Sequence, residues 1–237
     1  MFKTFGVGAL ALILAACGVL KARHAGPPNP NESVWPMDQQ FPGRIYHVDA
    51  GQSELRILVY RAGPLARFGH NHVVVNRALR GAVKLAEQPG ASGFSLNVPV
   101  DGFVVDDAQA RREEGPDFAA EVPDDAKSGT LQNMLGTSLL DAAEFPVIAV
   151  NSVSVSDAQG APGSGPQIAT VAISVAGRES RIEVPFNLQI DPSHLNVTGS
   201  LELRQSDLGL TPYSLMLGAL QVQDAMTIKF KIVAAPS

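Results

Sequence analysis

The sequence predicts an all-β domain of antiparallel strands with two short helices, preceded by an export signal and a polar tether. Apolar residues alternate with polar residues in six segments, and Gly- or Pro-containing turns separate several of them. Alternation gives a strand one buried and one exposed face, whereas strands of a parallel sheet covered on both faces are continuously apolar. Hydrophobic residues make up 45% of the 237-residue chain, which is enough for a sizeable core.

Residues 1–17 are predicted to form a lipoprotein signal peptide. Lys3 stands before an apolar run from Phe5 to Ala16, which is the arrangement of a secretory signal. The string Leu14-Ala15-Ala16-Cys17 resembles the lipobox of bacterial lipoproteins, whose cysteine is acylated and becomes the mature N-terminus. Cys17 is therefore the predicted lipidation site.

Two other interpretations of this segment stay open. A permanent transmembrane helix needs about 20 apolar residues, more than the run supplies. A plain secreted protein would carry the only cysteine of the chain as an unused thiol. The lipobox resemblance implies an exported protein of the bacterial envelope with an N-terminal acyl anchor. Gly18, rather than an aspartate, follows the cysteine, which implies the outer membrane on its periplasmic side.

Residues 18–43 are predicted to be a flexible, Pro-rich tether, and residues 44–235 a single folded domain. The tether contains His24-Ala25-Gly26-Pro27-Pro28-Asn29-Pro30-Asn31 and buries too little apolar surface to offset its chain entropy. A net charge of -5 leaves no basic footprint for nucleic acid. With one cysteine, no internal disulfide framework can form.

The alternating segments predict strands, and the residues between them predict turns. The predicted strands are residues 54–59, 94–100, 171–175, 182–190, 195–203 and 226–232. Ala176-Gly177-Arg178 and Asp191-Pro192-Ser193 are short enough to be tight hairpins. Residues 157–166 are rich in Gly and Pro and predict an exposed loop.

Two stretches in the middle of the chain predict helices instead. Residues 106–114 begin with two aspartates and end before Gly115, as a short helix would. Residues 130–142 place four apolar side chains on one helical face, with Thr130 as a possible cap. This second helix is expected to cover a mouth of the domain, either as a lid or as a permanent wall. Its apolar face consists of Leu131, Met134, Leu135 and Leu139.

An ordered series of short motifs along the domain resembles the YceI-like family of bacterial envelope proteins. The resemblance covers roughly residues 44 to 235. The motifs that carry it are Ile45-Tyr46-His47-Val48-Asp49, Ser53, Glu144-Phe145-Pro146-Val147-Ile148, Val175-Ala176-Gly177-Arg178, Gln205-Ser206-Asp207-Leu208-Gly209-Leu210 and Gly218-Ala219-Leu220-Gln221-Val222-Gln223-Asp224.

The resemblance implies an elongated, lipocalin-like antiparallel barrel of about eight strands that binds a polyisoprenoid or another long-chain lipid, such as a fatty-acid derivative. The implied role is sequestration or transport. A barrel of this size either fills with side chains or holds one small ligand. The chain has only 10 Phe, 3 Tyr and 1 Trp, so an aliphatic lining would leave room for a ligand. An ordinary packed core is the alternative.

The apolar lining is expected from the inward positions of the strands and of the second helix. The predicted lining residues are Leu55, Ile57, Val59, Phe94, Leu96, Val98, Met134, Leu135, Leu139, Val171, Ile173, Phe186, Leu188 and Leu201.

His70 and His72 form the most conspicuous polar pair. In a strand they would share one face, near enough to hold one ion, and neutral imidazole suits several transition metals. Zinc would need a third protein ligand, for which His47, Asp207 and Asp224 are candidates. The metal, if any, stays unknown. The pair could instead contact a ligand headgroup or hydrogen-bond the backbone at the barrel mouth. A metal- or haem-associated redox partner is therefore the alternative function.

The sequence gives no support for an enzyme. It contains no Gly-x-Ser-x-Gly nucleophile elbow, and Cys17 belongs to the export signal. No cofactor is indicated beyond a bound lipid. Arg61 and Arg67 flank the histidine segment and either meet an anionic headgroup or face water.

Overall fold

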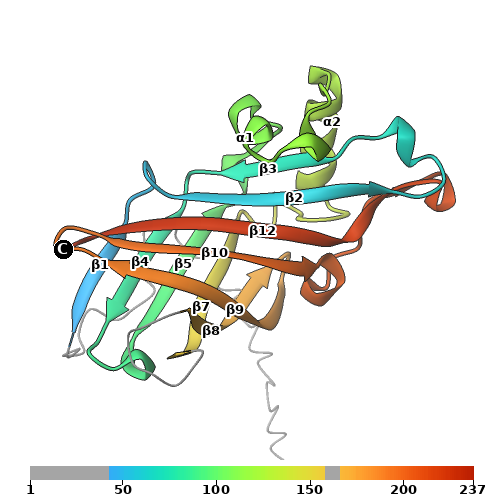
Figure 1. The fold of residues 1–237 in the computed structure, drawn as a ribbon. Coiled ribbons are helices and arrows are strands. Elements are labelled where there is room, and N and C mark those ends of the chain that lie inside the picture. Colours follow the sequence, from blue (N-terminus) through green and yellow to red (C-terminus); the bar gives the residue numbers. More distant parts are fainter. Residues whose placement is uncertain (1–42, 158–165) are drawn as a thin grey trace, which may run out of the picture.

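The computed structural model describes residues 43–157 and 166–237 (Figure 1). The predicted signal peptide, Cys17 and the tether up to residue 42 lie outside the described residues, as does most of the loop predicted at 157–166. Among the described residues, no helix combines the length and the apolar character needed to span a membrane.

Eight antiparallel strands form a closed barrel, which confirms the predicted fold class. Neighbouring strands are hydrogen-bonded all the way around the barrel, and the last strand pairs with the first (Figure 1). In order around the barrel, the strands are β1 (Arg44–Val48), β4 (Arg80–Leu85), β5 (Gly93–Pro99), β7 (Val147–Asp157), β8 (Gln167–Val175), β9 (Arg178–Ile190), β10 (Leu195–Arg204) and β12 (Leu220–Pro236).

One edge of β12 serves two different strands. Its last residues, Ala234–Pro236, pair with β1 and close the barrel, whereas residues 221–231 pair with β2 (Glu54–Ala62). From β2 the sheet continues through β3 (His72–Asn76) to β6 (Phe103–Val105). The two-residue strand β11 (Ser214–Leu215) pairs with the start of β12. The sheet therefore splits along its length.

Short 3-10 helices connect several of the strands. They are η1 (Ala66–Phe68), η2 (Pro89–Ala91), η3 (Val100–Gly102), η4 (Pro116–Phe118), η5 (Gln205–Leu208) and η6 (Met216–Gly218).

Helix α1 (Ala108–Glu113) confirms the first predicted helix. It begins where the Asp107 side chain accepts a hydrogen bond from the Ala110 backbone N–H at 2.9 Å, which satisfies one of the free donors of the first turn. Arg56 of β2 holds the end of α1, because its guanidinium donates to Glu113 at 2.6 Å and to Glu114 at 3.0 Å. The helix therefore lies against the outer face of the sheet (Figure 1).

The prediction of a second helix at residues 130–142 was wrong in its bounds. Helix α2 spans Asp124–Leu135, so Thr130 lies in its middle and caps nothing. Asp124 and Asp125 occupy the first turn, where carboxylates are favoured by the helix dipole. The chain then leaves the helix at Gly136, and residues 136–145 form turns.

The main core lies inside the barrel and a smaller one outside it. The inner cluster includes Val98, Phe103, Leu140 and Ile232. The outer cluster joins Val73 and Val75 of β3 to Leu58, Ala110 and Phe118, beneath α1 and η4. β3 is therefore covered on both faces.

Candidate ligand cavity

A cavity of about 820 Å³ runs through the barrel. Protein interiors contain few voids larger than a water molecule, so this volume is not a packing defect. It lies within the range of natural ligand pockets. The strands supply its wall through alternate residues: β8 contributes Gln167, Ala169, Val171, Ile173 and Val175.

The predicted lining residues lie together on this wall, with one exception. Leu135 packs against the inner core cluster without reaching the cavity, as does Leu131. Met134 and Leu139 do reach it, the first from α2 and the second from the turn after it. Together with Ala126, Thr130 and Asn133, Met134 makes α2 part of the cavity wall.

Several lining residues were absent from the predicted set. Leu195, Val197, Ile228, Phe230 and Ile232 belong to segments whose alternation was recognised, so the same signal could have identified them. A second group stands outside the predicted strands, where no such signal exists. It includes Leu79, Leu208 and Leu210.

The cavity reaches the surface at both ends of the barrel, where some of its lining residues are exposed. Phe68 and Tyr213 mark one end, next to η1 and β11. Glu87 and Ile190 mark the other end. The two ends differ in their polar residues: the first, which we call the polar end, is lined by His70, His72 and Arg61, and the second by Glu87 and Ser92.

The two histidines lie side by side at this first end. Their ring centroids are 6.1 Å apart, and both side chains line the cavity. Only His72 belongs to β3, whereas His70 precedes the strand. His72 Nδ1 lies 2.6 Å from Asp106 Oδ2, and its Nε2 lies 3.4 Å from the Thr130 hydroxyl. Asp106 therefore fixes the orientation of the His72 ring.

Asp106 is the centre of a buried polar network. Its side chain is fully buried, accepts a hydrogen bond from the Val73 N–H at 2.9 Å and forms an ion pair with Arg111. Burial raises the pKa of the Asp106 carboxyl, but hydrogen bonds from His72, Val73 and Arg111 outweigh it, so the pKa lies below its usual value. Arg111 also donates to the carbonyls of Asn71 and Ala120, both at 2.8 Å.

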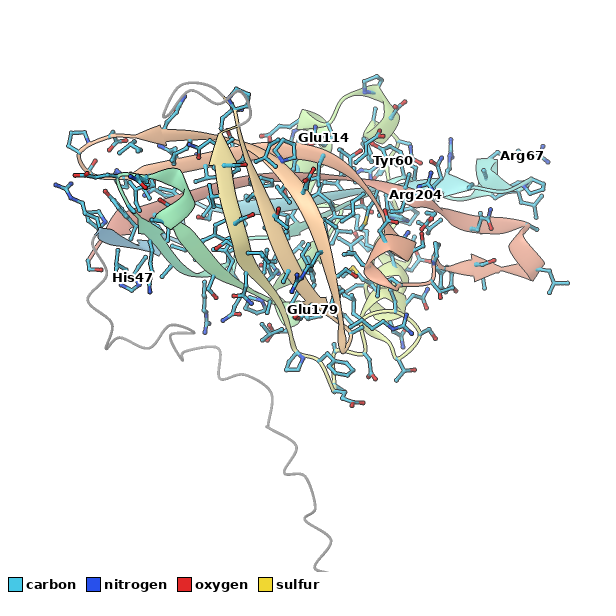
Figure 2. The ribbon with its side chains drawn as sticks, turned by 90° about the horizontal axis from the view of Figure 1, so that it is seen from below. His47, Tyr60, Arg67, Glu114, Glu179 and Arg204 are labelled. Carbon is cyan, nitrogen blue, oxygen red and sulfur yellow. The ribbon has the colours of Figure 1, made fainter. Side chains whose placement is uncertain are left out.

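The candidate third metal ligands do not join the histidine pair. His47 lies at the end of the molecule opposite Arg67 (Figure 2). Asp207 accepts from the Arg204 N–H, and Asp224 accepts from the Ser206 hydroxyl at 2.6 Å. The described residues contain no group of three His, Cys, Asp or Glu side chains suited to one metal ion.

Comparisons with known proteins agree with the fold. BcnA of Burkholderia cenocepacia is 15% identical, with a TM-score of 0.58 over 79% of this chain and 99% of its own. A polyisoprenoid binding domain from Saccharophagus degradans, implicated in plant cell wall breakdown, is 13% identical, with a TM-score of 0.54 over 81% of this chain and 98% of its own. A search of curated proteins gives no match.

The family comparison covers most of the chain. The YceI-like domain model matches residues 46–234, which include all eight barrel strands apart from a few terminal residues. The resemblance drawn from the sequence motifs is thereby confirmed, and the chain belongs to the YceI-like family.

Proposed function

We propose that the barrel binds one amphiphile and encloses its long apolar chain, a polyisoprenoid or a fatty-acid derivative. The observation that carries this proposal is the continuous cavity, whose wall is apolar along the middle of the barrel. An apolar cavity of this kind is a favourable environment for a hydrocarbon chain because the chain leaves water on entering it. The solved neighbour described as a polyisoprenoid binding domain supports the same class of ligand.

The cavity volume limits the size of the ligand. A dry apolar cavity of about 150 Å³ accommodates benzene, which has six non-hydrogen atoms. By that ratio, about 820 Å³ accommodates roughly 30 non-hydrogen atoms, which is the number of carbon atoms in about six isoprene units. A longer chain would extend beyond the barrel at one end.

The polar end of the cavity suits the headgroup of that ligand. His70 and His72 line it, Thr130 and Asn133 lie on the adjacent α2, and Arg61 contributes a positive charge. A hydroxyl, carbonyl or phosphate group could hydrogen-bond there while the chain points away along the barrel. Arg61 at this end attracts an anionic headgroup, whereas Glu87 at the other end repels one, and this difference supports the orientation.

The cellular setting is proposed from the N-terminal residues. Cys17 carries an acyl anchor, and the protein faces the periplasm from the outer membrane, where it sequesters or carries its lipid. Two or more acyl chains give stable attachment, whereas one gives only marginal binding. In this role the protein binds lipid without catalysing a reaction.

The test is identification of the bound lipid together with a pair of matched variants. Protein purified from native membranes is extracted with organic solvent, and the extract is analysed by mass spectrometry. Ile173→Asn places a polar group on the cavity wall, whereas Thr170→Asn changes the outer face of the same strand. We expect Ile173→Asn to lose bound lipid and Thr170→Asn to retain it.

Equal lipid content in the two folded variants would contradict binding inside the barrel. An extract without any stoichiometric long-chain compound, from protein that also fails to bind an added polyprenol, would contradict the proposal altogether.

A further inference from the structure

Large apolar side chains gather at one protruding end of the molecule. Five of the eight such side chains that are exposed in the described part of the chain belong to η1, β11 and their neighbours: Phe68, Tyr213, Leu215, Met216 and Leu217. We call these five residues the apolar tip. The other three exposed residues, Val104, Val153 and Ile190, belong to three different strands.

The two halves of the apolar tip are held together by the backbone. The Leu65 N–H donates to the Ala219 carbonyl at 2.8 Å, which joins the turn after β2 to the turn before β12. Gly63 packs so closely against Gly218 and Ala219 that an added Cβ would lie 2.6 Å from both carbonyl oxygens. Figure 1 shows these two turns projecting together beyond the barrel.

The most exposed residues of the tip also have an unusual backbone conformation. Met216 and Leu217 have φ values of 49° and 55°, in the left-handed region that bulky side chains disfavour. Met216 is 76% exposed, and Leu217 is fully exposed. Neither side chain lines the cavity or packs against a described core cluster. The fold thus holds two large apolar groups in water at a backbone conformation that gains them no internal contact.

The charge around the tip is opposite to that of the chain. The chain carries a net charge of -5, yet residues 61–72 and 209–223 contain no carboxylate side chain and include Arg61 and Arg67. The Arg67 guanidinium lies 4.6 Å from the centre of the Phe68 ring and is exposed at the end of the molecule (Figure 2). A convex apolar surface flanked by arginines matches an anionic lipid surface, where side chains enter the acyl region and cations meet headgroups.

We propose that the apolar tip docks on an anionic lipid surface, with Met216 and Leu217 inserted among the acyl chains. Phe68 and Tyr213 belong both to the tip and to the cavity lining, so the docked surface is continuous with the polar end of the cavity. Docking there gives a lipid a path between the membrane and the barrel that avoids water. This interaction surface goes beyond ligand binding and can be tested without it.

The first test places a reporter at the tip. In the full chain carrying Cys17→Ser, Leu217→Cys is labelled with an environment-sensitive fluorophore, and Val153→Cys, also exposed and apolar, is the matched control. Vesicles of phosphatidylcholine with phosphatidylglycerol should shift emission to the blue and expose the probe at 217 to quenching by acyl-brominated lipid. The probe at 153 should show neither effect.

Three outcomes would overturn the proposal. The probe at 217 could stay unchanged with vesicles, or it could respond no more than the probe at 153. It could also shift with protein concentration in the absence of vesicles, which would make the tip a contact between two copies of the chain.

The second test separates docking from ligand binding. The double variant Met216→Ser with Leu217→Ser should weaken partition into anionic vesicles by about tenfold for each side chain removed. Its affinity for a polyprenol in detergent should stay unchanged, because neither side chain lines the cavity. Arg67→Glu should weaken docking on anionic vesicles and leave any binding to neutral vesicles unchanged. If the double variant partitions into anionic vesicles as strongly as the wild type, docking by the tip is refuted. If neither the wild type nor any variant binds the polyprenol, only the cavity function is refuted.

Discussion

Replacing Asp106 with asparagine should destabilise the domain strongly, even though the substitution is nearly isosteric. Asn tolerates the left-handed backbone of this position, where φ is 58°, about as well as Asp does. Its side-chain oxygen can still accept from Val73. The change therefore removes the negative charge that faces Arg111 and replaces the oxygen that faces His72 Nδ1 with an amide NH2 group.

The expected magnitude follows from the burial of the pair. The Asp106 side chain is fully buried and that of Arg111 is 9% exposed. Breaking a buried ion pair by removing one partner costs about 3–5 kcal/mol, because an uncompensated charge remains. Arg111 keeps its hydrogen bonds to the Asn71 and Ala120 carbonyls, so we expect the lower end, about 3 kcal/mol. With a urea m-value of about 2 kcal/mol/M, the midpoint should fall by about 1.5 M.

The assay is urea unfolding followed by far-ultraviolet circular dichroism. Asp124→Asn is the matched control, because that carboxylate pairs with Lys127 at the exposed start of α2 and its loss should leave the midpoint in place. Adding Arg111→Met to Asp106→Asn should recover part of the loss, since the unpaired charge disappears. A midpoint change below about 0.5 M for Asp106→Asn, the size expected of a surface pair, would refute the reasoning.

Other contacts lead to four further predictions. The pKa of Asp106 is lowered in the folded state, so its ionised carboxyl stabilises the fold fully above the unfolded pKa of about 3.9. This stabilisation is lost as pH falls below that value. Asp106→Asn should therefore make the free energy of unfolding, measured with urea, depend less on pH in this acid range. Gly199→Ala should cost about 1–3 kcal/mol in the same assay, because its Cβ would lie 2.3 Å from the Phe230 ring, whereas Gly129→Ala, with open space in α2, should stabilise by up to about 1 kcal/mol; equal effects would contradict this packing. His70→Ala should weaken lipid affinity, measured by titration with a polyprenol, with little change in the urea midpoint, whereas His72→Ala should lower both because it leaves Asp106 without that partner. Cys17→Ser should move the protein from the membrane to the soluble fraction on cell fractionation; a variant that stays membrane-bound would place the anchor elsewhere.

Six strands with one face toward water were predictable from alternation, whereas β1, β4 and β7 of the same barrel, and β3, which is covered on both faces, were not among the predicted strands. All six alternating segments are strands of the barrel or of its extension. β3 escaped because Val73, Val74 and Val75 form a continuous apolar run: Val74 faces the interior, while the other two pack beneath α1. Alternation reports one exposed face, so a strand between two cores carries no such signal.

The bounds of α2 were mispredicted for a related reason. Its apolar residues Leu131, Met134 and Leu135 stand among the last five residues of the helix, whereas its first turns carry aspartate, lysine and serine. Apolar periodicity therefore marks only the end of the helix and extends past it to Leu139, which follows a turn at Gly136. Acidic residues after Pro123 were the signal for the true start.

The network around His72 could not be predicted from local sequence. Asp106 and His72 are 34 positions apart, and only the pairing of β3 with β6 brings their elements together. In the sequence, Asp106 stands beside Asp107 at the start of the predicted helix, and in the structure only Asp107 caps the helix. Local sequence places Asp106 at a solvated helix start. The pairing of the strands instead buries Asp106 against Arg111 and His72.

The position of β1 sets the geometry of the whole molecule relative to a membrane. β1 pairs with the last residues of β12, whereas the apolar tip comes just before the first residue of β12. At about 3.3 Å per residue, the two ends of β12 lie about 55 Å apart. The 26 residues from 18 to 43 measure at most about 85–95 Å when extended. A lipid on Cys17 would thus be joined to the end of the barrel opposite the tip. The maximum length of the connecting residues exceeds the length of β12. With the proposed lipid on Cys17, the tip either turns back to the leaflet that holds this lipid or docks on a second bilayer that faces it.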